Sequence, residues 1–128
     1  MRLLLDTHAL LWAVSGDAAL SRKAAAAIAD LENEIYVSAA SVWEIATKFR
    51  NGKLPNADPF VHAMAESLQR LGFRGLPISL EHAGRAGLLP GEHRDPFDRM
   101  LVAQAQAEDL VLVSNERVFD EWKVRRLW

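Results

Sequence analysis

The feature that most constrains the fold is an alternation of short apolar runs with longer helical patterns. The runs predict strands at residues 3–5, 35–38, 77–79, 110–114 and 124–127. Between them, helical patterns cover residues 7–15, 21–31, 40–50, 58–71, 81–88, 96–108 and 117–122. Strands that alternate with helices are typical of an α/β protein. We therefore predict a central, mainly parallel sheet of four or five strands with helices on both faces.

The length of 128 residues fits a single domain, residues 1–128. No apolar run approaches the roughly 20 residues that span a bilayer. The N-terminal apolar run is interrupted by Asp6, where a signal peptide would continue apolar. The sequence thus predicts a cytoplasmic protein that makes no use of a membrane.

Charge and cysteine content limit the chemistry. The formal net charge is −2, so any contact with nucleic acid must come from local basic groups. The chain has no cysteine, which excludes disulfides and thiolate ligands. A metal site in this chain must use oxygen or imidazole ligands, and carboxylates favour Mg²⁺ or Mn²⁺.

Five carboxylates map to one edge of the predicted sheet. In an open parallel sheet, the carboxyl ends of the strands and the first turns of the following helices share a rim where ligands bind. The acids predicted to lie at this rim are Asp6, Glu44, Asp95, Asp98 and Glu116. They are spread over 110 positions of sequence, so the fold itself must bring them together.

The segment HRDPFDRML, residues 93–101, places two aspartates at the start of a helix. Asp95 precedes Pro96 and is predicted to be the N-cap, with proline at the first helical position. Asp98 is different, because helical periodicity places it on the apolar stripe with Leu101 and Val102. A charge on the core-facing side of a helix needs a hydrogen bond, an ion pair or a metal.

Two of the other acids have plain structural alternatives. Glu44 lies nearly opposite the apolar stripe of its helix and four residues before Lys48, the spacing of a surface ion pair. Asp6 stands between a strand and a helix, where an aspartate is a common N-cap. For both residues, spacing leaves the structural and the functional interpretation open.

Four segments, in order and spacing, carry a family likeness: LLLDTHALLW (3–12), SVWEIATKFRNGKL (41–54), HRDPFDRMLVAQA (93–105) and LVSNERVFDEW (112–122). Together they resemble the PIN-domain ribonucleases, specifically the VapC toxins of bacterial toxin-antitoxin pairs. The likeness covers nearly the whole chain. It implies a PIN-like three-layer sandwich.

The resemblance also implies the roles of the acids. It makes Asp6, Glu44 and Asp98 the ligands of one or two divalent cations, Mg²⁺ with Mn²⁺ as a substitute. Glu116 is the expected fourth catalytic acid, where aspartate is common in the family, and it acts either directly or through a water. Ser114 stands where the family usually has serine or threonine. Asp95 is expected either to support the ligands or only to cap its helix.

Basic and imidazole groups near the rim also have candidate roles. Arg94 and Arg99 are candidates for contact with substrate phosphate, with solvation or a pair to a nearby acid as the alternative. Surface or packing roles are expected for His8 and His93.

The function implied by the resemblance is a Mg²⁺-dependent endoribonuclease toxin that hydrolyses phosphodiester bonds in RNA. Its expected partners are a cognate VapB-type antitoxin and a second copy of the chain in a homodimer. One alternative is a phosphatase that forms an aspartyl-phosphate on Asp6, but His8 replaces the second aspartate that such enzymes carry. The other alternative is a non-catalytic PIN-like module that binds nucleic acid or protein.

Overall fold

The computed structural model describes residues 1–128. Five strands are formed: β1 (Arg2–Leu5), β2 (Glu34–Ser38), β3 (Arg74–Leu76), β4 (Val111–Val113) and β5 (Arg126–Leu127). The helices are α1 (Thr7–Ser15), α2 (Arg22–Ala29), α3 (Ala39–Arg50), α4 (Asp58–Val61), α5 (Met64–Leu71), α6 (Leu80–Leu88) and α7 (Pro96–Glu108). Two short 3-10 helices complete the chain, η1 (Pro55–Ala57) and η2 (Arg117–Glu121).

The strands form one parallel sheet in the order β3-β2-β1-β4-β5. The predicted α/β class is therefore confirmed. β1 is central, and the side chains of Leu3, Leu4 and Leu5 are fully buried. Because successive side chains of a strand point to opposite faces, Leu3 and Leu5 enter one hydrophobic core and Leu4 enters the other. This explains why the strand is apolar without alternation.

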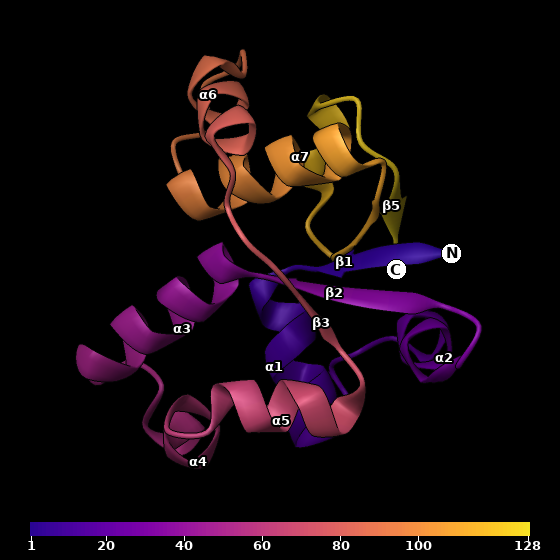
Figure 1. Cartoon of the computed structure of the whole chain (residues 1–128), viewed down its shortest axis with the longest axis vertical. Helices are drawn as coiled ribbons and strands as arrows, with labels where there is room; N and C mark the ends of the chain where they lie inside the picture. The colour runs from indigo at the N-terminus through magenta and orange to yellow at the C-terminus, as the bar shows by residue number, and fades with distance from the viewer.

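Figure 1 shows three layers, with α6, α7 and η2 on one face of the sheet and α1, α2, α4 and α5 on the other. The strands are parallel, so their carboxyl ends lie together, away from the N-terminus marked in Figure 1. β2 runs into α3 at this rim, and β1 runs into α1 through Asp6. The layer arrangement thus gathers the ends of separate strands at one side of the molecule.

Side-chain caps set the start of five helices. Each capping side chain accepts a hydrogen bond from a backbone N–H of the first turn, which would otherwise lack a partner. The caps are Asp6 of α1, Ser21 of α2, Ser38 of α3, Ser79 of α6 and Asp95 of α7. Three of them, Asp6, Ser38 and Asp95, stand at the helices that border the rim.

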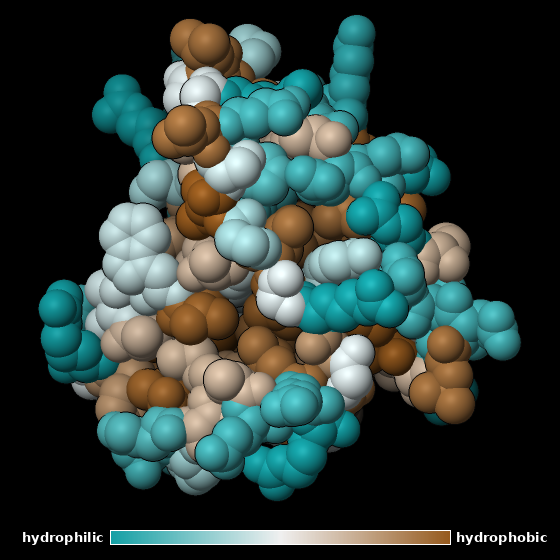
Figure 2. Space-filling model, viewed as in Figure 1, coloured by the Kyte–Doolittle hydropathy of each residue, from teal (hydrophilic) through white to brown (hydrophobic).

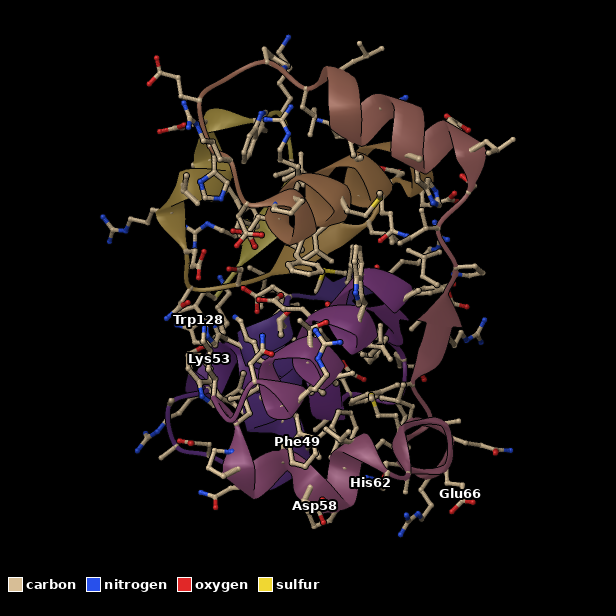
Figure 3. All side chains as sticks on the ribbon, turned by 90° about the vertical axis from the view of Figure 1, so that its left-hand side faces the viewer. Phe49, Lys53, Asp58, His62, Glu66 and Trp128 are labelled. Atoms are coloured by element: carbon tan, nitrogen blue, oxygen red, sulfur yellow. The ribbon has the colours of Figure 1, made fainter.

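Two predicted elements differ from the structure. The edge strand β3 occupies residues 74–76 rather than 77–79. Its residues are mostly exposed, so they form no apolar run, and Pro77 cannot continue the ladder because it has no N–H. The predicted helix 58–71 is two helices, because the backbone of Ala63 leaves the helical conformation. Figure 3 shows Phe49 and His62 near this break, and their rings meet edge to face at 5.7 Å.

The surface carries an apolar hollow between α3 and α5, where Figure 2 shows brown and tan side chains. Val42, Met64, Leu68 and Phe73 are among its lining residues.

None of the helices combines the length and the apolar character needed to span a membrane.

Candidate active site

Asp6 lies at the end of the central strand and is almost fully buried, with 4% of the residue exposed. Its Oδ1 accepts a hydrogen bond of 2.8 Å from the Ala9 N–H, so the expected cap is present. Burial raises the pKa of Asp6, while the Ser114 side chain and the Ala9 N–H act in the opposite direction. Asp6 is therefore both a cap and a desolvated carboxyl group at the rim.

Glu44 is also buried, with 6% of the residue exposed. The Thr7 hydroxyl donates to its Oε1 at 2.6 Å, and the Lys48 ammonium lies 2.6 Å from its Oε2. The ion pair with Lys48 that the spacing indicated is thus formed. The interpretation of Glu44 as a surface residue is wrong, because α3 packs against both α1 and α7 and is covered on more than its apolar stripe.

Asp95 and Asp98 divide the two tasks that their sequence pattern suggested. Asp95 Oδ1 accepts from the N–H groups of Phe97 and Asp98, at 2.9 and 3.3 Å. Asp98 is partly buried, and its Oδ2 lies 2.8 Å from His93 Nε2. Burial raises the pKa of Asp98 to about 6, with His93 opposing this and the charges of Asp95 and Glu116 adding to it.

Glu116 and Ser114 follow β4. Ser114 is fully buried, and its hydroxyl oxygen accepts from the Glu116 N–H at 3.0 Å. The Glu116 side chain is 37% exposed, more than the other acids proposed as catalytic, and its Oε1 lies 3.5 Å from His8 Nδ1. His8 in turn stacks on Trp12 at 5.5 Å. Glu116 therefore reaches the rim from its solvent side.

Charges at the rim act across elements that are far apart in the sequence. Glu116 raises the pKa of both Asp6 and Asp98. The hydrogen bond to Glu44 raises the pKa of Lys48, and the charges of Asp95 and Asp98 add to it. The structure thus brings together, at one rim, acids that lie far apart in the sequence.

The ligand atoms available at the rim are of the kind that binds a hard divalent cation. The rim offers carboxylate oxygens, the ligand type that Mg²⁺ and Mn²⁺ prefer, and burial disfavours the charged forms of Asp6 and Asp98 unless a cation compensates them. As the side chains stand, no three acidic or histidine side chains are grouped to hold a metal ion. Protein donors occupy the oxygens instead, Lys48 on Glu44 and His93 on Asp98.

The two arginines differ in their surroundings. The Arg99 guanidinium donates to the backbone carbonyls of Ala86, Leu89 and His93 rather than to an acid. Arg94 is exposed and lines a polar hollow together with His93 and Arg99. Arg99 thus holds the loop before α7, and Arg94 remains available to a ligand.

Two contacts at the rim were not anticipated. The bond of His93 to Asp98 joins a loop residue to a helix residue five positions on, a spacing with no helical or strand periodicity. The bond of Thr7 to Glu44 spans 37 positions of sequence, and Thr7 directly follows Asp6. Thr7 is not among the site residues predicted from the sequence, and its position directly after the rim acid Asp6 is the one local signal for it.

Fold and site together define an α/β domain with carboxylates at the carboxyl ends of a parallel sheet, an arrangement that suits metal-dependent hydrolases. Residues 3–124 match the PIN domain. The chain therefore belongs to the PIN-domain family.

Similar proteins agree with this assignment. The chain is 41% identical to ribonuclease VapC16 of Mycobacterium tuberculosis over 61 residues, which are 48% of this chain and 42% of that protein. The chain thus spans less than half the length of this curated relative. Two solved structures share the fold. DNA-bound VapBC from Salmonella typhimurium has a TM-score of 0.72 at 17% identity, covering 99% of this chain and 97% of that chain. VapC20 of M. tuberculosis, a toxin that cleaves the sarcin-ricin loop, has a TM-score of 0.62 at 18% identity, covering 96% and 98%.

Proposed function

We propose that this protein is a Mg²⁺-dependent endoribonuclease that acts as the toxin of a VapBC-type pair. The observation that carries the proposal is the rim itself. Carboxylates at the start of α1, on α3 and on α7 border this rim, two of them with raised pKa values, in a chain of the PIN-domain family. The name of its relative VapC16, a ribonuclease, supports the same activity.

Asp6, Glu44 and Asp98 are the proposed metal ligands. Each is at least partly buried and stands at the start of a helix or one to two turns into it, so its backbone is held by regular structure. When bound, the divalent cation supplies an activated water and stabilises charge on the phosphoryl group and the leaving oxygen. The chain contributes the fixed carboxylates and keeps bulk water from Asp6 and Glu44.

Glu116 has a different proposed role. It is more exposed than the three ligands and follows the buried Ser114, which fixes the turn after β4 by accepting from the Glu116 N–H. We assign it to hold a water at the solvent side of the rim. Asp95 supports the site by capping α7, which orients the first turn that carries Asp98.

RNA is the proposed substrate. The net charge of −2 gives no general attraction for a polyanion, so local groups must hold the phosphates. Arg94 suits this task because it is exposed in the hollow beside His93, the partner of Asp98. Arg99 has its guanidinium committed to backbone carbonyls and serves the loop instead.

A VapB-type antitoxin and a second copy of the chain are the proposed partners. The solved structures of similar fold include VapBC complexes. Several large hydrophobic side chains are exposed on this chain, including Leu31, Trp43, Leu80 and Leu88. Contact with a partner would remove such side chains from water.

Controlled expression in a bacterial host tests the proposal. Wild type should arrest growth, and RNA from arrested cells should contain new discrete fragments. Asp6→Asn should abolish both effects, while Glu66→Gln should behave as wild type because Glu66 is exposed on α5, away from the rim (Figure 3). Growth arrest with intact RNA would contradict the ribonuclease and favour a non-catalytic binding module.

A further inference from the structure

Lys48 places a cation inside the acid rim. It lies one turn after Glu44 on α3, and its Nζ is 2.6 Å from Glu44 Oε2. The other oxygen of Glu44 accepts from the Thr7 hydroxyl at 2.6 Å. Both oxygens of this buried carboxylate are therefore engaged by protein donors before any metal ion binds.

The surroundings of Lys48 attract its ammonium group and also allow it to leave the ion pair with Glu44. The charges of Asp95 and Asp98, as well as Glu44, act on its ammonium. Its side chain is 39% exposed, whereas that of Glu44 is 8% exposed. A long, flexible lysine side chain with this exposure has a path to solvent, whereas the glutamate side chain is largely covered. Lys48 can leave the pair, and Glu44 stays at the rim.

We propose that the Lys48 ammonium is a built-in counter-ion that occupies Glu44 in the metal-free protein and is displaced from it when a divalent cation binds. Lys48 then competes with the metal and sets its affinity. The inference rests on the proposed role of Glu44 as a ligand.

A role of Lys48 in orienting Glu44 predicts the opposite change in metal affinity when Lys48 is replaced. If Lys48 only oriented Glu44 for the metal, its removal would misplace a ligand and weaken binding. If it is a competing cation, removal eliminates a like charge and frees one carboxylate oxygen, so binding tightens. The sign of the change in metal affinity therefore decides between the two roles.

Titration calorimetry of Mn²⁺ into the metal-free, full-length protein at low salt and pH 7.5 measures this sign. We expect Lys48→Gln to bind Mn²⁺ roughly tenfold more tightly than wild type. Lys48→Arg keeps the charge and should stay close to wild type. Lys53→Gln is the matched control, because it removes the same charge from an exposed lysine outside the acid rim. Unchanged or weaker binding by Lys48→Gln would overturn the inference.

A second measurement uses the wild type alone, so it does not depend on the folding of a variant. Acetic anhydride modifies free amines, and mass spectrometry quantifies each lysine. Mg²⁺ should increase modification of Lys48 and leave that of Lys53 unchanged. Equal modification of Lys48 with and without Mg²⁺, in protein that binds Mg²⁺, would overturn the inference.

Glu44→Gln separates this inference from the proposed function. Weaker Mn²⁺ binding by Glu44→Gln supports Glu44 as a ligand, and the Lys48 variants then test the counter-ion. If Glu44→Gln binds Mn²⁺ as wild type does, or if wild type binds no Mn²⁺, the proposed metal centre fails and the inference fails with it.

Discussion

His93 Nε2 lies 2.8 Å from Asp98 Oδ2, so a loop residue holds a carboxylate on the first turn of α7. His93 also packs edge to face against Trp122, with 5.7 Å between ring centroids. Arg99 donates to the carbonyl oxygen of His93. The loop before α7 is thus anchored at three points, and one of them is the proposed metal ligand Asp98.

The first prediction concerns pH. Burial raises the pKa of Asp98 to about 6, above its ordinary value in the unfolded chain. The folded state therefore binds the Asp98 proton more tightly than the unfolded chain does. The stability that this protonation contributes is lost as the pH rises through about 6. Metal-free wild type should lose thermal stability between pH 5 and pH 7.5 relative to Asp98→Asn, as measured by circular dichroism melting. Parallel melting-temperature profiles for the two proteins would contradict the prediction.

The second prediction concerns the hydrogen bond of Thr7 to Glu44. Thr7→Val removes the hydroxyl and leaves a buried carboxylate oxygen without its donor. The metal-free protein should lose about 1–2 kcal/mol in its free energy of unfolding, measured with urea. Thr7→Ser keeps a hydroxyl and should lose much less. A loss as large for serine as for valine would assign the effect to packing rather than to the hydrogen bond.

Asp95 allows its cap and its charge to be separated. Asp95→Ala should destabilise the protein by about 1 kcal/mol because the Phe97 and Asp98 N–H groups lose their acceptor. Asp95→Asn keeps a capping oxygen, so its stability should remain near that of wild type, while the loss of charge weakens Mn²⁺ binding slightly. Urea unfolding and calorimetry report the two properties. If the asparagine variant unfolds as easily as the alanine variant, the cap interpretation is wrong.

Arg99 and Arg94 are expected to respond differently to the same substitution, because only Arg99 donates to the backbone of the loop before α7. Arg99→Met removes hydrogen bonds to three backbone carbonyls, and it should reduce the free energy of unfolding by about 2 kcal/mol. Arg94→Met should leave stability unchanged, because Arg94 is exposed, and should weaken RNA binding. Unfolding curves and RNA-binding assays on both variants provide the check. Full stability of Arg99→Met would remove the structural role assigned to this arginine.

Much of the fold was predictable because its signals are local. The central strand β1 is apolar on both faces, and the caps of α1 and α7 stand where Asp6 and Asp95 occur in the sequence. The position of the edge strand β3 is not predictable in this way, because a mostly exposed strand needs no apolar run. The break between α4 and α5 at Ala63 carries no glycine or proline signal.

The candidate site was predictable only in part. Strand ends and helical periodicity placed Asp6 and Asp98 at one rim, and the structure has both there. The burial of Glu44 depends on how α1 and α7 pack around α3, which the periodicity of a single helix does not contain. The contacts of Thr7 and His93 join segments through tertiary packing, so no local pattern specifies them.

Cleavage of total RNA by the purified protein, freed of any co-purifying partner, tests the central claim most directly. Wild type, Asp98→Asn and the control Glu66→Gln are compared with Mg²⁺ and with EDTA, after circular dichroism has shown that each is folded. We predict discrete fragments from wild type and from Glu66→Gln with Mg²⁺, and intact RNA with EDTA or with Asp98→Asn. Fragments that persist in EDTA, or with Asp98→Asn, would contradict a metal-dependent ribonuclease built on this rim.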